Sequence, residues 1–108
     1  MKVLHLEFDG FDWDSGNLKK IQKHGLSLEE VESLFRQELL VLKDEKHSGI
    51  ETRTIAVGNS NRQRAAFVVF TMRKLQELRL IRVVSARYMH KKERELYENL
   101  KKGIEEAG

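Results

Sequence analysis

The sequence contains no cysteine and no proline among its 108 residues. The lack of cysteine excludes disulfide bonds, thiolate catalysis and zinc–thiolate sites, and it is typical of proteins in a reducing cytosol. The longest uninterrupted apolar run extends only from Ala65 to Phe70, whereas a membrane span needs roughly 20 apolar residues. Glu7 and Asp9 interrupt the region in which a signal peptide would be apolar. We therefore expect a cytoplasmic protein with no membrane partner.

The excess of positive charge is small. Lys and Arg total 20 against 17 Asp and Glu, which gives a formal net charge of +3. This charge permits an anionic partner such as nucleic acid, but a solvated surface of mixed charge explains it equally well. Because 108 residues is the size of one domain, we expect residues 1–108 to form a single domain with one core.

The first third of the chain predicts one strand and two helices. The segment Val3–Phe8 alternates between large apolar and other residues, which predicts a strand, and the "DG" pair after it predicts a turn. Asp14 is a suitable N-cap for the first helix, and Gly25 marks its end. The segment "SLEE" is a capping box. In such a box the Ser27 hydroxyl accepts from the Glu30 N–H, and the Glu30 carboxylate accepts from the Ser27 N–H.

The rest of the chain predicts four strands and a final helix. The helix is Lys91–Glu106, with Tyr97, Leu100 and Ile104 as its buried stripe and Leu96 beside them. Loops are expected at "KDEKHSG", "GNSNR" and "KLQE". Short connections imply antiparallel pairing, so we predict an α+β fold, with a mostly antiparallel sheet, N-terminal helices and a C-terminal helix. The four strands are predicted at residues 39–42, 52–59, 63–73 and 78–87.

Known catalytic motifs are absent from the sequence. It has no glycine-rich phosphate loop, no HExxH and no GxSxG. The four histidines lack the spacing of metal ligands, so we expect no metal site and no cofactor. The single Trp13 is more typical of a packing residue than of a platform for stacking a base.

Arginines lie within the predicted strands, where long cations are unusual. Arg53 is near the start of one strand, Arg73 ends the next, and Arg82 and Arg87 lie in the last. Counting along the hairpins places Arg82 on the face opposite to the other three, unless a bulge intervenes. Two explanations stay open: arginines that snorkel from a half-exposed sheet, or an anion site. His24, at a helix end, can likewise be a cap or a proton donor.

Several segments together resemble those of one known protein family. "FDWDSGNLKKIQKHGLSLEEVESLF" is similar to the family's W-D-x-G-N segment, its K-H-G-[VL]-S segment and its acidic "EE" helix. "KDEKHS" resembles the loop before the central strands, "TRTIAVG", "FVVFTMR" and "IRVVSAR" resemble those strands, and "KKERELYE" resembles the last helix. This family is that of the BrnT toxins, and the resemblance to it extends from Phe11 to about Glu98. It departs from the family at the loop "KLQE", where glycine is common, and at His90, where a better N-cap is usual.

The resemblance implies a RelE-like fold and a function. BrnT proteins are endoribonuclease toxins of type II toxin–antitoxin pairs, which cut RNA and arrest growth. The implied partners are an RNA substrate and a small ribbon–helix–helix antitoxin, BrnA-like, in a hetero-oligomer that reaches operator DNA only through the antitoxin. The alternative is a non-catalytic binding module that uses its arginine-bearing sheet to hold nucleic acid or an acidic protein.

The resemblance also assigns roles to the strand arginines. Arg53, Arg73 and Arg87 match arginines of the family, and we expect them to stabilise the negative charge that builds on the phosphate during metal-independent RNA cleavage. A planar guanidinium that is always charged suits this role, because it binds phosphate in a bidentate way.

Other residues are assigned to proton transfer and to RNA binding. His24 or Tyr97 is expected to transfer a proton. Glu93 is either the base or only the partner of a nearby arginine. Steering of RNA phosphates, which gives affinity without sequence choice, is assigned to Lys20, Lys23 and Arg82.

Overall fold

A computed structural model of the chain describes residues 2–43 and 52–107. Most of the predicted loop "KDEKHSG" lies outside this range. No helix among the described residues is long and apolar enough to cross a membrane. The helices are α1 (Ser15–Lys23), α2 (Leu28–Leu34) and α3 (Lys91–Ala107). The strands are β1 (Lys2–Leu4), β2 (Gly10–Phe11), β3 (Leu39–Lys43), β4 (Thr54–Asn59), β5 (Ala65–Leu75) and β6 (Leu78–Tyr88).

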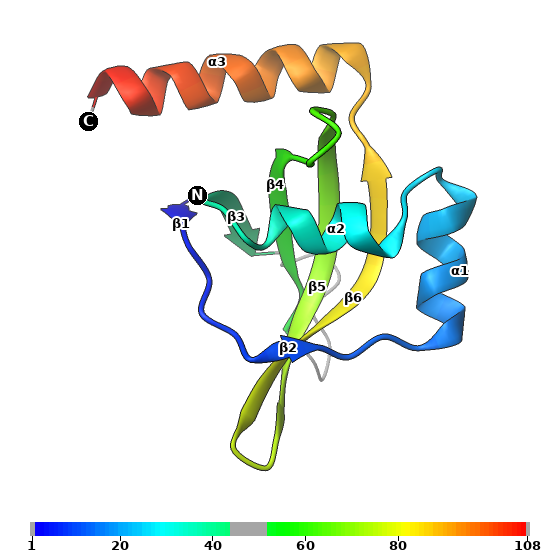
Figure 1. The fold of residues 1–108 in the computed structure, drawn as a ribbon. Coiled ribbons are helices and arrows are strands. Elements are labelled where there is room, and N and C mark those ends of the chain that lie inside the picture. The colour runs from blue at the N-terminus through cyan, green and yellow to red at the C-terminus, as the bar shows by residue number, and fades with distance from the viewer. Residues whose placement is uncertain (1, 44–51, 108) are drawn as a thin grey trace.

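One six-stranded sheet organises the chain, in the order β1-β3-β4-β5-β6-β2. All neighbouring strands are antiparallel except β2, which is parallel to β6. In Figure 1, α2 crosses one face of the sheet, α1 lies beside β6, and α3 extends across the end of the sheet. The prediction of an α+β fold with a mostly antiparallel sheet is confirmed. However, the sheet is mixed, and two short strands precede α1 and α2 instead of the single predicted strand.

The N-terminal segment differs from the predicted strand. Pairing of β1 with β3 ends at Leu4, opposite Leu39, and the chain then crosses to the other edge of the sheet, where β2 replaces the predicted "DG" turn. Leu6 and Phe8 pack against the core without joining a strand. The alternation of apolar residues therefore reflects burial of one side of this segment, which does not require a ladder of hydrogen bonds.

The main core lies between the sheet and α1 and α2. Its centre is Phe35, which is fully buried and meets the rings of Phe8, Phe11 and Phe70 edge-on at 5.1 to 6.4 Å between centroids. Edge-to-face contacts of this kind add to the burial of apolar area. Truncation of such a residue to Ala typically costs about 3–5 kcal/mol, so Phe35 is a principal anchor of α2 on the sheet.

The helix ends follow the predicted caps in part. Asp14 Oδ1 accepts from the Asn17 N–H at 2.7 Å, and Ser27 Oγ accepts from the Glu30 N–H at 3.1 Å. Gly25 has the positive φ of +89° that a residue after a helix C-cap commonly adopts. The second half of the predicted capping box is wrong, because the Glu30 carboxylate points inward. It is 1 % exposed and accepts hydrogen bonds from two hydroxyls brought by the sheet, Ser60 Oγ at 2.7 Å and Tyr88 OH at 2.5 Å.

The opposite face of the sheet is less covered. A small cluster of Leu40, Val57, Ala65, Met89 and Tyr97 joins it to α3. Of the predicted α3 stripe only Tyr97 is buried. Leu100 and Ile104 stay partly exposed at hollows that open between α3 and the sheet, and Leu96 beside them lines one of these hollows. The exposed fractions are 62 % for Leu96, 39 % for Leu100 and 40 % for Ile104.

Candidate active site

The strand arginines share this less covered face. Arg87 is paired with Phe67 of β5, and Arg82 is paired with Thr71. Directly paired residues point to the same face, as do alternate residues along one strand. Arg73, two residues beyond Thr71, therefore shares the face with both Arg82 and Arg87.

A β-bulge corrects the predicted position of Arg82. The register between β5 and β6 shifts at Val69/Phe70, where the partners change from Ser85 to Val83. One residue of β6 is thus extra, and the alternation of β6 side chains reverses at that point. Simple hairpin counting placed Arg82 opposite to Arg87, and the bulge brings them to one face.

A hollow of about 320 Å³ opens on this face beside the start of α3. Ile55, Phe67, Val69 and Ser85 contribute from the sheet. His24, Arg87 and Glu93 also line it: His24 follows α1, Arg87 comes from β6, and Glu93 comes from the first turn of α3. The fold thus brings together three of the residues that the sequence nominated, from three separate elements.

Arg87 is held in place on several sides. Its Nη1 and Nη2 donate to the two carboxylate oxygens of Glu93, each at 2.9 Å, and Nη1 also donates to the Tyr88 carbonyl at 3.2 Å. The guanidinium carbon lies 4.6 Å from the centroid of the Phe67 ring. A guanidinium has five N–H donors, so these bonds leave Nε–H and one Nη2 hydrogen. That pair forms a side fork that can bind two oxygens of a phosphate.

Glu93 is a weak base in this setting. The hydrogen bonds from Arg87, and next the one from the His90 N–H, lower the pKa of Glu93 from 4.5 to about 2. The same pairing raises the pKa of Arg87. The His90 N–H donates to Glu93 at 2.9 Å, so Glu93 caps α3 from its third residue. This bond satisfies a backbone donor at a helix start where His90 is a poor N-cap residue. The geometry favours the second role offered for Glu93, as partner of an arginine.

Arg73 and Arg82 are engaged elsewhere. Arg73 Nη1 donates to Asp12 at 2.7 Å, and Arg82 Nη2 donates to Asp14 at 2.5 Å with Asp12 3.6 Å away. The pKa of Asp14 is lowered, first by the bond from the Asn17 N–H and then by Arg82. These arginines fasten the segment before α1 to β5 and β6, and neither lines the hollow.

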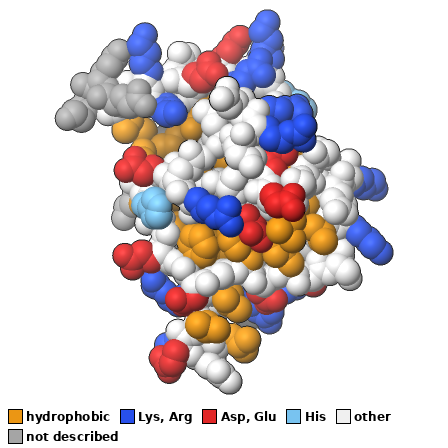
Figure 2. Space-filling model, viewed as in Figure 1, with side chains coloured by type: hydrophobic (Ala, Val, Ile, Leu, Met, Phe, Trp, Pro, Cys, Tyr) orange, Lys and Arg blue, Asp and Glu red, His pale blue; other side chains and the backbone are white. Residues whose placement is uncertain are grey.

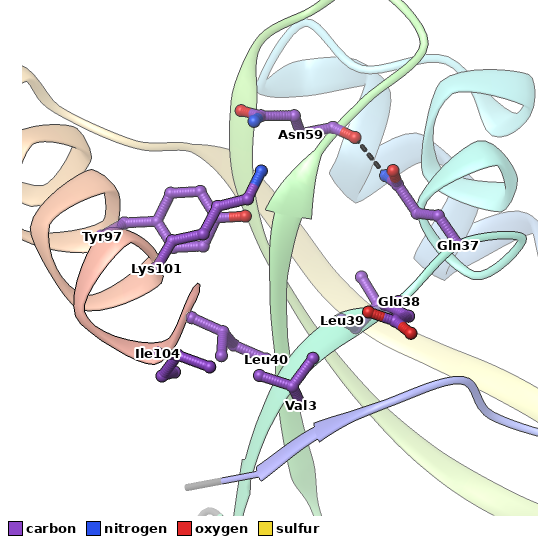
Figure 3. Close-up of a pocket in the computed structure, with 9 residues that line it drawn as sticks. All are labelled: Val3, Gln37, Glu38, Leu39, Leu40, Asn59, Tyr97, Lys101 and Ile104. Carbon is purple, nitrogen blue, oxygen red and sulfur yellow. Dashed lines mark hydrogen bonds between the residues drawn. The ribbon is translucent and has the colours of Figure 1, made fainter. Parts of the chain in front are cut away.

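The other nominated residues lie outside the hollow. Arg53 is half-buried just before β4. Tyr97 lines two different hollows under α3, one of which is shown in Figure 3. Lys20 and Lys23 are exposed in the last turn of α1, and Figure 2 shows separate basic side chains along the edge of the molecule on the side where α1 lies.

Sequence reasoning missed several residues around the site. Ser85 and Phe67 line the hollow, but in the sequence they look like ordinary strand residues. Asp12 was not nominated either, and the only hint of a role for it in the sequence was its place in the aromatic and acidic segment "FDWD". Trp13 is a packing residue, as expected, and its Nε1–H donates to Glu32 at 2.9 Å. Among the described residues, no group of three His, Asp or Glu side chains is arranged to hold a metal ion.

Comparison with known families gives a match over most of the chain. The family model described as "Ribonuclease toxin, BrnT, of type II toxin-antitoxin system" matches residues 13–93, which include His24, Arg87 and Glu93. A search of the curated proteins finds no match. The fold and the site define a small α+β protein with a guanidinium and an imidazole at an open hollow.

Because the match covers well over half of the chain, the chain belongs to the BrnT family. It is therefore an endoribonuclease toxin of a type II toxin–antitoxin system, and not a non-catalytic binding module. Its substrate is RNA, and its partner is an antitoxin protein.

Proposed function

We propose that this toxin cleaves RNA in the cytoplasm without a metal ion, in the hollow between His24, Arg87 and Glu93, on a RelE-like fold. The observation that carries the proposal is the convergence of these three side chains on one hollow of about 320 Å³. An imidazole and a preorganised guanidinium supply the two functions that this reaction needs, namely proton transfer and charge stabilisation.

The reaction uses the 2′-hydroxyl of the RNA as its nucleophile. The 2′-oxygen attacks the adjacent phosphorus, the bond to the 5′-oxygen of the next nucleotide breaks, and a 2′,3′-cyclic phosphate remains. His24 accepts the proton of the 2′-hydroxyl or delivers one to the leaving 5′-oxygen, and water supplies or takes up the other proton. The side fork of Arg87 binds the non-bridging oxygens, whose negative charge increases in the transition state. Glu93 keeps the guanidinium in position.

Cleavage in the presence of a chelator tests the chemistry. We expect purified toxin to cut single-stranded RNA equally well with and without EDTA, and to leave 2′,3′-cyclic phosphate ends. A His24→Gln variant prepared in the same way shows whether the activity belongs to the protein or to a contaminant. Activity that disappears with EDTA and returns with Mg²⁺ or Mn²⁺ would show the metal-free mechanism to be wrong.

We also propose that the antitoxin is a BrnA-like ribbon–helix–helix protein and that it binds along α3. A hollow of about 200 Å³ lies under this helix, lined almost entirely by apolar side chains that include the exposed Leu96 and Leu100. Phe67 and Glu93 line both this hollow and the one that holds Arg87. An amphipathic antitoxin segment that fills the apolar groove therefore extends to the active site and blocks it. Operator DNA is then contacted only by the antitoxin.

Two leucines of equal exposure provide a matched test. Leu96 on α3 and Leu75 on the β5–β6 hairpin are each 62 % exposed. After co-expression with the antitoxin, native mass spectrometry should show a hetero-oligomer for wild type and for Leu75→Glu, and mainly free toxin for Leu96→Glu. Equal capture of both variants would place the antitoxin on another surface. Free wild-type toxin at every salt concentration would contradict a stable complex.

A further inference from the structure

Most arginines of the described residues have a carboxylate partner, but a few do not. Five are paired with Asp or Glu at 2.5 to 3.6 Å, namely Arg36, Arg73, Arg79, Arg82 and Arg87. Within the described part of the chain, Arg53, Arg62, Arg64 and Arg94 have no such partner. Arg53 lies before the start of β4, whereas Arg62 and Arg64 belong to the turn after its end. The unpaired cations thus gather mainly at the β4–β5 turn and the start of α3.

A polar hollow of about 390 Å³ opens at the same place. Arg64 lines it from the β4–β5 turn, Tyr88 and Met89 from the end of β6, and Arg94 and Glu98 from α3. Among the described residues, Glu98 is the only carboxylate that lines it, so the two guanidinium groups leave an excess of positive charge around a space large enough for a nucleotide.

Both the turn and the Arg64 side chain are fixed. The Ser60 N–H donates to the Arg64 carbonyl at 2.9 Å, and the Ser60 hydroxyl donates to the buried Glu30. The Arg64 guanidinium lies 3.5 Å above the centroid of the Tyr88 ring, and the Tyr88 hydroxyl is itself bonded to Glu30 at 2.5 Å. A guanidinium that lies flat on a ring keeps its N–H donors at its edges, where an anion can reach them. The buried carboxylate of Glu30 thus serves as an anchor for a cationic surface.

The hollow lies next to the candidate active site along the chain. Arg87 and Glu93 line the active-site hollow, whereas their immediate neighbours Tyr88 and Arg94 line this one. Successive residues of a strand point to opposite faces, so the two hollows lie on either side of the connection from β6 to α3. An RNA strand that crosses this connection can contact both.

We propose that Arg64 and Arg94 bind phosphate groups of the RNA chain at a position flanking the cleaved bond. This inference rests on the proposed function and adds to it a second contact, which holds the substrate while Arg87 acts on the scissile phosphate. Because the contact is to phosphate, it contributes affinity and salt dependence without choice of sequence.

Binding of a non-cleavable RNA tests this contact separately from catalysis. The probe is a fluorescent single-stranded RNA with 2′-O-methyl groups, and its Kd is measured by anisotropy over a range of salt. The double variant Arg64→Gln/Arg94→Gln should bind at least about 10-fold more weakly. Its slope of log K against log salt should be smaller by about 1.4, since each lost contact to single strands removes about 0.7. The control Lys74→Gln/Lys102→Gln removes the same charge from exposed positions and should behave like wild type.

Other outcomes of these measurements either overturn or support phosphate binding by Arg64 and Arg94. Retained affinity and an unchanged slope in Arg64→Gln/Arg94→Gln would overturn it, as would loss of antitoxin capture with normal RNA binding. An Arg64→Lys/Arg94→Lys variant that keeps most of the salt slope supports contact with phosphate over a purely structural role. The proposed active site is tested independently by cleavage in Arg87→Ala, whose failure to lose activity leaves RNA binding by Arg64 and Arg94 intact.

Discussion

Replacement of Arg87 with Ala separates the catalytic role of this arginine from its structural one. The variant loses the paired bonds to Glu93 and the contact with Phe67. Half-exposed ion pairs are worth about 0.2–1 kcal/mol, and a cation–π contact of this exposure contributes about 0.5–1 kcal/mol. The expected loss of stability is therefore roughly 1–2 kcal/mol, which corresponds to a fall in Tm of about 5–10 °C for a chain of this size. The protein should stay folded at 25 °C.

The same replacement should lower the rate of RNA cleavage far more than it lowers the stability of the fold. Loss of one preorganised donor to a developing oxyanion lowers the rate by about 10²-fold or more. Arg87→Lys should recover little activity, because an ammonium cannot both pair with Glu93 and offer a second fork to phosphate. Single-turnover cleavage of RNA, measured beside thermal unfolding, gives both quantities. A folded Arg87→Ala variant with wild-type cleavage and full growth arrest would refute the assignment.

Glu93→Gln is the matched control, since it removes the carboxylate and leaves the guanidinium. If Glu93 only positions Arg87, this variant should lose activity modestly, and a loss as large as that of Arg87→Ala would instead identify Glu93 as the base. The folded-state pKa of Glu93, about 2, is below its ordinary value of 4.5. Its contribution to stability is therefore present above pH 4.5 and lost as the pH falls toward 2. The stabilities of wild type and Glu93→Gln should converge over that interval.

Two further predictions follow from residues outside the hollow. Because Arg73 is bonded to Asp12, Arg73→Ala should lower Tm while cleavage per folded molecule stays within a few-fold of wild type. A loss of cleavage of about 10²-fold without a change in Tm would instead identify Arg73 as catalytic. Gln76 has a φ of +55° in the β5–β6 turn, a conformation that costs residues other than glycine roughly 1 kcal/mol. Gln76→Gly should therefore raise the free energy of unfolding, measured in urea, by up to that amount. A decrease would contradict the turn geometry.

Local signals in the sequence were sufficient for the helices and most strands. Asp14 and Ser27 cap α1 and α2 as expected because an N-cap bond joins residues only three apart. Gly25 ends α1 for an equally local reason, its positive φ. The central strands were found within a few residues, and the loop expected at "KLQE" is a tight turn whose outer residues Leu75 and Leu78 still pair. The glycine common in the family at this turn fits the positive φ of Gln76.

Features that depend on distant segments could not be read locally. The Glu30 carboxylate was expected to turn back to its own helix, but two hydroxyls from the sheet, Ser60 and Tyr88, provide bonds inside the core. The helical periodicity of α3 was correct, yet it did not reveal that Leu96 and Leu100 line an open hollow above the sheet and stay exposed. Periodicity shows which side of a helix is apolar, and only the tertiary structure shows what covers it.

The role of a strand arginine in this fold is decided by the carboxylates within its reach, which come from parts of the chain far away in sequence. Arg73 and Arg82 meet Asp12 and Asp14, about sixty to seventy residues earlier. Through these bonds, Arg73 and Arg82 fasten the sheet to the segment before α1. Arg87 is also paired, but with a glutamate that leaves a side fork open toward a hollow. Arg64 and Arg94 have no carboxylate partner among the described residues and line a second hollow. We therefore propose that the arginines that line a hollow bind RNA, whether paired, as Arg87 is, or not, and that Arg73 and Arg82, which line neither of these hollows, are structural.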